Sequence, residues 1–410
     1  MEEYADGRSQ AQAEELRALS LQITPIVLRS FSRNSYSRAF SQSSRKLNEI
    51  LFEVAVARIR PSIVFSMSLF QGLHEDVSSG YRKLYWHAEH FCILYDLIPL
   101  MENNRYLRTR RALHWYHEKL ELLLGSDRIM TISEFVGAQF CERFPSHREK
   151  LIIIHAGGRE RFFDIGEPRT RSHGRAILYV GSIEPRKNIE TLIRAFAAIP
   201  EDCRTTLTLR LVGRSKRKYR ENLARLATSL GLVRGIDFLF VENATDDQVI
   251  KYYLESRLFV FPSVSEGFGL PVLEAMQLGV PVLAANATSI PEVLGCEKLL
   301  FPPLDFNILS KKIRHLLNDE IAYTKASSYC HNRSLSYRWE DVIGRVNLSQ
   351  STPTKNLQLT DQTQLETPAL DLNFAESIDI LMLAKYRKLV KFLKSNAVRL
   401  EETIDTLTCH

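Results

Sequence analysis

The chain lacks the features that mark several large classes of protein. Its 410 residues include only six cysteines, none of them in a Cys-x-x-Cys pair, so neither a zinc knuckle nor a disulfide framework is indicated. No uninterrupted apolar run approaches the roughly eighteen residues of a membrane-spanning helix. The first residues, Met1-Glu2-Glu3-Tyr4-Ala5-Asp6, are acidic and lack the apolar core of a secretory signal. We therefore expect a cytoplasmic protein.

Charge and composition narrow the choice further. The 54 Lys and Arg residues against 48 Asp and Glu residues give a formal net charge of +6. This excess favours anionic ligands or a membrane surface and is too small to indicate nucleic acid. With 45% apolar and 25% charged residues, the chain has the composition of a soluble globular protein. It is too long for one ordinary core and suits two domains with appendages.

Short apolar segments alternate with amphipathic ones along most of the chain. The apolar segments cover residues 63–69, 91–97, 128–133, 151–155, 177–181, 207–213, 238–241, 258–262 and 280–285. Strands that are apolar throughout and alternate with helices are typical of parallel sheets covered on both faces. We therefore predict an α/β protein with two doubly wound units. A polar, turn-rich stretch over residues 164–175 suits a hinge between them.

The C-terminal part of the chain has a different character. Residues 350–373 are rich in Thr and Gln and are predicted to form a polar linker. Residues 375–408 are predicted to form one basic amphipathic helix, whose heptad seam contains Tyr386, Leu389, Leu393, Leu400 and Leu407. Such a helix is compatible with a protein partner, with a membrane surface or with packing on its own protein, and the pattern leaves the three open.

One strand-loop-helix segment carries most of the chemical information. The apolar run 258–261 leads into a loop with Glu266, Gly267 and Gly269, and then into a helix that contains Glu274. Glycines let the backbone approach a ligand, and the N–H groups at the start of the helix are expected to face an anion; these belong to Phe268, Gly269 and Leu270. The two glutamates are expected at the mouth of the sheet, where carboxylates can bind sugar or ribose hydroxyls. The alternative is an ordinary strand-loop-helix unit with exposed glutamates.

A second anion site is predicted where the apolar run 177–181 ends. Gly181 and Ser182 form a turn there, and Arg186 and Lys187 stand just before the next helix, in a position that suits a diphosphate. Asn188 is predicted to cap that helix, which spans residues 189–199. The alternative is a solvated basic turn without a ligand.

Together these segments resemble the GT-B-fold glycosyltransferases of glycosyltransferase family four. Glu266 and Glu274 have the spacing of that family's Glu-x7-Glu signature, and Gly213 stands in its nucleotide-side loop. Other matching segments are Leu94-Tyr95-Asp96-Leu97-Ile98-Pro99, Ile132-Ser133-Glu134-Phe135, Ser289-Ile290-Pro291-Glu292-Val293 and Tyr337-Arg338-Trp339-Glu340. Residues 68–72 and 183–188 resemble the subgroup that builds bacterial O-antigen and other surface polysaccharides, in which mannosyltransferases are frequent.

The resemblance implies the GT-B fold, in which two Rossmann-like domains face each other across a cleft. It implies an acceptor-side domain at residues 1–165, a nucleotide-sugar domain at 174–335 and a helix at 336–349 that crosses back to the first domain. The strand and glycine-rich loop with which family members begin are expected to be missing, because Met1 leads almost directly into a predicted helix at 11–22. Tyr95 and Ser182 stand where many members carry His and Arg.

The resemblance also implies roles for individual residues. Arg186 and Lys187 would neutralise the donor diphosphate, Glu266 would hold sugar hydroxyls and Glu274 would bond the ribose. Asp96 would act on the acceptor side, near residues 68–72, and its alternative role is a structural hydrogen bond at a strand end. The donor site would be completed by Gly181, Ser182, Gly213, Gly267, Phe268, Gly269 and Leu270.

These expectations describe a retaining hexosyltransferase of surface polysaccharide synthesis that needs no metal or other cofactor. The favoured donor is GDP-mannose, with UDP- and dTDP-sugars as alternatives, and the acceptor is a glycan or a lipid-linked sugar. Two other functions remain open: a catalytically silent or partial GT-B protein that acts as a binding partner, and a sugar-nucleotide epimerase. A peripheral position at the inner membrane face is a further expectation, and no nucleic acid partner is expected.

Overall fold

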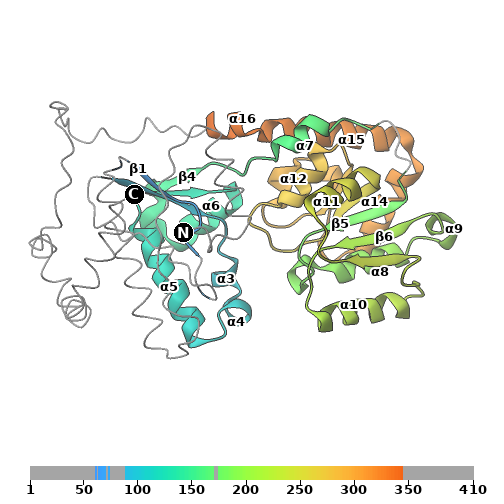
Figure 1. Ribbon diagram of the computed structural model, residues 1–410, viewed down its shortest axis with the longest axis horizontal. Coiled ribbons are helices and arrows are strands. Elements are labelled where there is room, and N and C mark those ends of the chain that lie inside the picture. The colour runs from blue at the N-terminus through green and yellow to red at the C-terminus, as the bar shows by residue number, and fades with distance from the viewer. Residues whose placement is uncertain (1–60, 62, 71–72, 74–87, 170–173, 345–410) are drawn as a thin grey trace, which may run out of the picture. The chain divides into compact units, whose positions relative to one another are not determined.

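The computed structural model describes residues 61, 63–70, 73, 88–169 and 174–344 (Figure 1). Several predictions fall outside them: the helix at 11–22, the missing first strand, the linker at 350–373 and the helix at 375–408. Those features stay predictions.

The first part of the described chain builds a four-stranded parallel sheet in the order β1-β2-β3-β4. Its strands are β1 (Ile63–Ser66), β2 (Glu89–Leu94), β3 (Arg128–Thr131) and β4 (Leu151–Ile153). Its helices are α3 (Ile98–Met101), α4 (Asn103–Tyr106), α5 (Arg110–Gly125), α6 (Glu134–Arg143) and the 3-10 turn η1 (Pro145–Lys150). The next helix, α7 (Glu160–Ile165), contributes Phe162 to the core of the second sheet. Leu94 of β2, Leu120 of α5 and Phe140 of α6 share one buried core.

The second part builds a six-stranded parallel sheet in the order β10-β9-β8-β5-β6-β7. The strands are β5 (Ala176–Val180), β6 (Thr208–Val212), β7 (Phe238–Val241), β8 (Ser256–Phe261), β9 (Val282–Ala285) and β10 (Leu300–Phe301). Counted from β5, this is the order 3-2-1-4-5-6 of doubly wound dinucleotide-binding sheets. The strand order reverses between β5 and β8, so their carboxyl ends flank the place where such sheets bind ligands.

Helices cover both faces of the second sheet. Figure 1 shows α8 (Ile189–Ala197) and α10 (Arg217–Ser229) on one side of the strands, and α11 (Asp246–Glu255) and α12 (Leu270–Gln277) on the other. The remaining elements are η2 (Pro185–Lys187), α9 (Glu201–Arg204), α13 (Ile290–Leu294), η3 (Glu297–Leu299), α14 (Phe306–Asn318), α15 (Glu320–Ser334), η4 (Leu335–Tyr337) and α16 (Trp339–Gly344). The strands β5, β8 and β9 between these layers are almost wholly buried, as their largely apolar sequences predict.

The predicted strands are confirmed, since each of the nine apolar segments overlaps one of β1 to β9. Sequence analysis missed β10, because a strand of two residues leaves no pattern. The helix predicted at 189–199 ends at Ala197, because Pro200 disfavours helical geometry in the residue before it. Within the described part of the chain, none of the helices combines the length and apolarity that a bilayer crossing requires.

The predicted domain boundaries stay a prediction, although the two sheets lie within them. The described residues between α7 and β5 belong to no helix or strand. Near the end of the described chain, the carbonyl oxygen of Tyr337 accepts a hydrogen bond from the N–H of Gly158 at 2.9 Å. The chain that leads into α16 therefore returns to the segment just before α7.

Candidate active site

The predicted site residues gather at the carboxyl ends of β5 and β8, where the strand order reverses. The loop after β5 contains Arg186 and Lys187, and the loop after β8 contains Glu266. Because β5 and β8 are hydrogen-bonded neighbours, side chains that are 79 residues apart in sequence come together here.

Glu266 is the centre of a buried ionic cluster. One of its oxygens, Oε1, accepts a hydrogen bond from Lys187 Nζ and another from Ser263 Oγ at 2.5 Å. Its other oxygen, Oε2, lies 3.2 Å from Nη1 of Arg186. Arg186 is held in turn by the carbonyl oxygen of Ser265 at 2.7 Å and by Glu184 at 3.0 Å. The prediction that Glu266 holds sugar hydroxyls stays a prediction, and in the structure both its oxygens contact protein cations.

Lys187 is unusual in being a buried ammonium. Only 6% of Lys187 and 8% of Glu266 is exposed. Burial lowers the pKa of Lys187, and the carboxylate of Glu266 acts in the opposite direction. The charge of Glu266 is therefore what keeps a cation at this position.

The backbone around Glu266 is held by the loop after β9. The hydroxyl of Thr288 accepts a hydrogen bond from the N–H of Glu266 at 3.0 Å. The hydroxyl of Ser289 lies 3.1 Å from the carbonyl oxygens of both Glu266 and Phe268. Thr288 takes this position with φ at +51°, which a β-branched residue rarely adopts. Such strain persists only where the surrounding structure imposes it, and it clusters at functional sites.

Gly267 and Gly269 shape the loop after β8. Gly269 has φ of +104° and directly precedes α12, whose first turn includes a proline. A Cβ atom at Gly267 would lie 2.4 Å from the carbonyl oxygen of Tyr95 and 3.1 Å from Cβ of Asp96. The loop after β8 therefore touches the residues that follow β2. Of the N–H groups predicted to face an anion, that of Leu270 is the first of α12, and those of Phe268 and Gly269 directly precede it.

Asp96 lies within electrostatic reach of the ionic cluster. Its Oδ1 accepts a hydrogen bond from the N–H of Ile98 at 2.9 Å, so the structural bond that was its alternative role exists. Burial raises the pKa of Asp96, and the charges of Arg186, Glu266 and Lys187 also act on its carboxyl group. Asp96 therefore makes the structural hydrogen bond at the strand end and also lies near the ionic cluster.

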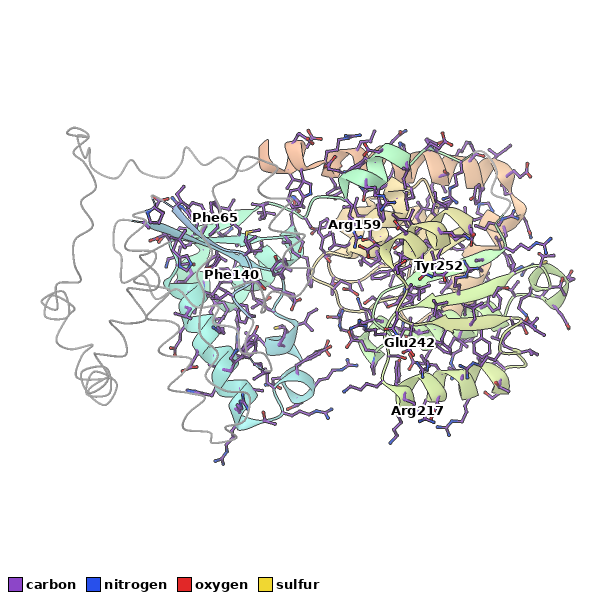
Figure 2. All side chains as sticks on the ribbon, in the orientation of Figure 1. Phe65, Phe140, Arg159, Arg217, Glu242 and Tyr252 are labelled. Atoms are coloured by element: carbon purple, nitrogen blue, oxygen red, sulfur yellow. The ribbon has the colours of Figure 1, made fainter. Side chains whose placement is uncertain are left out.

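Glu274 is held by two residues that sequence analysis did not select. Arg159 Nε lies 3.0 Å from Oε1 of Glu274, and the hydroxyl of Tyr253 donates to its Oε2 at 3.1 Å. Arg159 stands just before α7 and is labelled in Figure 2. Burial raises the pKa of Glu274, while Arg159 opposes that shift. A small pocket of about 190 Å³ borders Glu274 and is also lined by Arg159, Leu270 and Trp339.

The loops after β5 and β6 meet through glycine. Gly181 and Gly213 have φ of +144° and +147°. A Cβ atom at Gly213 would lie 1.8 Å from the carbonyl oxygen of Gly181, so no side chain fits between the two loops. Ser182 bonds its neighbour Glu184 at 3.0 Å. These predicted donor-site residues therefore share the strand edge that carries the ionic cluster.

The predicted cap by Asn188 is wrong. Asn188 precedes α8 with φ of +54°, and its side chain makes no capping hydrogen bond. Its Nδ2 instead donates to the carbonyl oxygens of Pro262 at 3.2 Å and Pro303 at 2.6 Å. In this backbone conformation the amide reaches the loop after β8, so Asn188 ties the two loops together instead of capping the helix.

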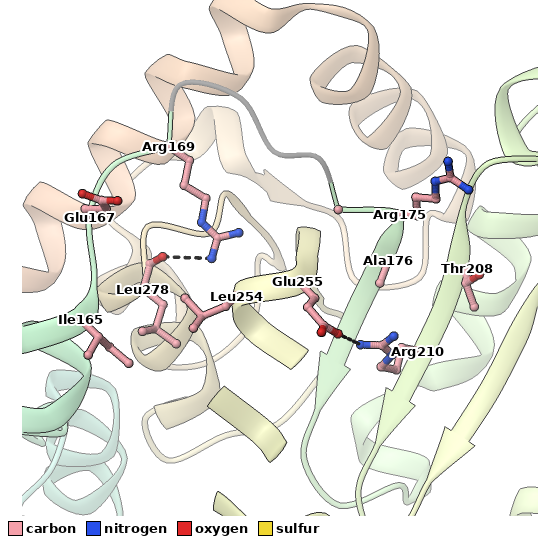
Figure 3. Close-up of a pocket in the computed structure, with 11 residues that line it drawn as sticks. Ile165, Glu167, Arg169, Arg175, Ala176, Thr208, Arg210, Leu254, Glu255 and Leu278 are labelled. Carbon is pink, nitrogen blue, oxygen red and sulfur yellow. Dashed lines mark hydrogen bonds and ion pairs between the residues drawn. The ribbon is translucent and has the colours of Figure 1, made fainter. Parts of the chain in front are cut away.

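A larger pocket, of about 620 Å³, lies at the opposite end of the second sheet (Figure 3). It is lined by Ala176 and Thr208, the first residues of β5 and β6. Two of its arginines are engaged by protein groups: Arg210 pairs with Glu255 at 3.3 Å, and Arg169 donates to three backbone carbonyls. Open α/β sheets bind ligands at the carboxyl ends of their strands, so this pocket is not the candidate site.

Comparisons with known proteins find glycosyltransferases that are similar to this chain. Residues 161–333 match the family model described as glycosyl transferases group 1. The serotype-specific mannosyltransferase WbdA of Escherichia coli is 32% identical over 377 residues, which cover 88% of this chain and 44% of that protein. The chain thus spans less than half the length of this relative.

Two solved structures show the fold. A sucrose-phosphate synthase from Thermosynechococcus elongatus has a TM-score of 0.62 at 20% identity, covering 82% of this chain and 91% of that chain. HepE of Anabaena, solved in complex with UDP and glucose, has a TM-score of 0.58 at 17% identity, covering 83% and 88%. With the two parallel sheets described above, these likenesses confirm the GT-B fold class.

Proposed function

We propose, on the premise that residues 161–333 belong to the glycosyl transferases group 1 family, that this chain transfers a sugar from a nucleotide-diphosphate donor. The observation that carries the proposal is the cluster of Lys187, Arg186 and Glu266 at the point where the strand order reverses. Mannose is the favoured sugar, because a relative that aligns with 88% of this chain is named as a mannosyltransferase. The proposed acceptor is a glycan or a lipid-linked sugar.

The cations of the cluster are suited to a diphosphate. Arg186 and Lys187 supply two positive charges that Glu184 and Glu266 balance, so the site is close to neutral before a donor binds. A diphosphate would add negative charge beside these cations and beside the N-terminus of α12, where helix N–H groups favour anions. Fixed charges that need no reorganisation stabilise a departing diphosphate efficiently.

Glu266 is proposed to position groups, not to act as a nucleophile or as a general acid. Its two oxygens already contact the ammonium of Lys187 and the guanidinium of Arg186, so both are engaged with fixed cations of the protein. This differs from glycosidases, in which one carboxyl group donates a proton and another attacks the sugar. We infer that transfer retains the anomeric configuration, with the leaving diphosphate taking the proton of the acceptor hydroxyl.

Glu274 and Arg159 are proposed to hold the nucleoside end of the donor. Glu274 is largely buried but borders a pocket, and its carboxylate can accept hydrogen bonds from a ribose diol. Arg159 keeps this carboxylate oriented and charged against the effect of burial. We expect Glu274→Ala to weaken nucleotide binding about tenfold or more, since hydrogen bonds to a charged group contribute about 1.5–3 kcal/mol. Unchanged affinity would refute the ribose role.

The first test is a thermal-shift panel with GDP, UDP, dTDP, ADP and CMP. A ligand that binds only the folded state stabilises it by RT ln(1 + [L]/Kd), so millimolar nucleotide reveals even a modest site. We expect one diphosphate, with GDP favoured, to raise the melting temperature above the others. A chain that no nucleotide stabilises would refute the proposal.

The second test is sugar transfer by variants at the cluster. Lys187→Ala should lower turnover by about 100-fold or more, because it removes a fixed charge from the leaving group. Lys251→Ala is the matched control, since Lys251 is an exposed lysine of α11. We also expect EDTA to leave transfer unchanged, because Arg186 and Lys187 provide the positive charge that a metal would otherwise supply. Nucleotide binding without transfer by the unmodified chain would favour the silent-partner function.

A further inference from the structure

Two sequence motifs to which the proposed function gives no role contact each other directly. Oε1 of Glu292 accepts a hydrogen bond from the N–H of Glu134, and Oε2 accepts one from the N–H of Phe135, both at 3.0 Å. The acceptor belongs to α13 of the second sheet's domain and the donors to α6 of the first. Ser133 bonds the N–H of Val136 at 3.1 Å. The first N–H groups of α6 are thus paired with side chains, two of them with one distant glutamate.

The chemistry of this contact favours one defined geometry. A carboxylate at a helix N-terminus is stabilised by the helix dipole, and hydrogen bonds to a charged acceptor are stronger than neutral ones. Two parallel N–H groups bound by the two oxygens of one carboxylate also fix its direction. The side chain of Glu292 is 19% exposed, and burial raises its pKa. His155 Nε2 lies 3.9 Å from its Oε1 on the same side.

The residues that directly precede the helix of Glu292 hold the loop that contains Glu266. Thr288 and Ser289, which hold the backbone of Glu266 and Phe268, directly precede α13. The carbonyl oxygen of Glu292 itself accepts hydrogen bonds from Arg333 Nη2 at 2.8 Å and from the hydroxyl of Tyr337 at 3.1 Å. One short segment, residues 288–292, therefore holds the Glu266 loop at one end and α6 at the other.

The start of α6, which Glu292 contacts, lies at the same sheet edge as Asp96. Leu94 of β2 pairs with Thr131 of β3 in parallel register. Asp96 follows Leu94 by two residues and Ser133 follows Thr131 by two, so both lie at the same edge of the first sheet. Fixing the start of α6 therefore fixes the edge that carries Asp96.

We propose that Glu292 is a positioning residue. It holds the edge of the first sheet that carries Asp96 in a fixed position relative to the loop that carries Glu266, as sugar transfer requires. This inference rests on the proposed function, because the effect of the contact is on the transfer step. Glu292 makes no contact with Arg159, Glu274 or Lys187 among the bonds of the described residues. Its loss should therefore lower kcat and leave nucleotide affinity unchanged.

The decisive variants remove the contact from either side. Glu292→Gln keeps the shape of the side chain but removes its charge and one acceptor oxygen. Glu134→Pro removes the donor N–H at the first position of α6, where proline is well tolerated, and the extended backbone of Ser133 suits a following proline. Glu134→Ala is the matched control, because it removes the same side chain and keeps the N–H. Glu297→Gln controls for loss of a nearby exposed carboxylate.

We expect Glu292→Gln and Glu134→Pro each to lower kcat about 10- to 100-fold, since small misplacements of reacting groups have effects of that size. The Kd of the stabilising nucleotide should stay within about twofold, and both controls should keep their activity. The double variant should be no slower than the slower single variant, because both changes remove one contact. Multiplicative losses in the double variant, equal losses in Glu134→Pro and Glu134→Ala, or loss of nucleotide affinity would overturn the proposal.

Hydrogen exchange separates this inference from the proposed function. In the full chain without substrate, Glu292→Gln should speed exchange of the amides at residues 134–135 and leave the rest of α6 unchanged. Unaltered exchange at those two amides would overturn the contact whatever the chain catalyses. Faster exchange together with an unmodified chain that transfers no sugar would refute the proposed function and leave the contact established.

Discussion

Replacing Glu266 by Gln tests whether charge holds the buried cluster together. Gln fills the same space and can still accept one hydrogen bond, but Lys187 loses the anion that offsets its burial. Removing one partner of a buried ion pair typically costs about 3–5 kcal/mol, and the retained hydrogen bond offsets about 1 kcal/mol of that. We therefore expect Glu266→Gln to lower the free energy of unfolding by about 3 kcal/mol at pH 7.

The stability that Glu266→Gln loses should depend on pH. Burial already lowers the pKa of Lys187, and without Glu266 the pKa falls further. The folded variant then binds fewer protons than its unfolded chain between the two pKa values of this lysine, so its stability rises with pH in that window. The deficit relative to the unmodified protein should therefore be smaller at pH 9.5 than at pH 7.

Urea unfolding of four proteins provides the assay: the unmodified chain, Glu266→Gln, Lys187→Met and the double variant. The double variant should be more stable than Glu266→Gln alone, because it no longer buries an unpaired cation. Interacting pairs depart from additivity by about 0.5–3 kcal/mol. Additive losses, or a deficit that does not shrink between pH 7 and pH 9.5, would refute the reasoning.

Three further substitutions follow from the geometry of the loops and of Glu274. Gly213→Ala should cost about 3 kcal/mol or more in thermal unfolding, because its Cβ would lie 1.8 Å from a backbone oxygen, whereas Gly231→Ala, which meets no atom within 4 Å, should cost about 1 kcal/mol. Gly267→Ala should lower turnover about tenfold or more, because its Cβ would push against the carbonyl oxygen of Tyr95; normal turnover would show that this approach is unimportant. Because the pKa of Glu274 is raised in the folded chain, that chain binds more protons than the unfolded chain at pH values between the two pKa values of this group. The stability of the unmodified protein therefore falls as pH rises through this range. The stability of Glu274→Gln relative to the unmodified protein should accordingly be greater at pH 7.5 than at pH 4.5. An equal difference at both pH values in urea unfolding would contradict the shift.

The fold could be predicted because its signal is local. Apolar segments such as 177–181 and 258–262 are strands that a parallel sheet buries on both faces, so their composition alone marks them. The Glu-x7-Glu spacing likewise lies within one strand-loop-helix unit. The cap predicted for Asn188 failed for the same reason: the residue type suits a cap, but the left-handed backbone aims the amide at Pro262 and Pro303, which are distant in sequence.

The contacts of the site could not be predicted from local patterns, because they depend on strand order. Lys187 reaches Glu266 only because β8 pairs with β5 and not with β7, its predecessor in the chain. Arg159 reaches Glu274 although 115 positions separate 159 from 274 and no motif marks the arginine. A sequence with the same strands in another order would keep every motif and lose the pair of Lys187 and Glu266.

Glu292 is a harder case, because its partners are backbone N–H groups, which every residue except proline carries. No pairing of residue types in the sequence could reveal it, and a substitution of Glu134 that keeps the N–H leaves the contact intact. The identity of Ser133 is the one local sign, since a serine before a helix shows that the first turn is paired with side chains. Water or another part of the chain can satisfy the remaining donors of that turn, and in this protein a carboxylate of the segment that supports Glu266 does so. The role of the motif around Glu292 therefore follows from the backbone N–H groups that its carboxylate reaches.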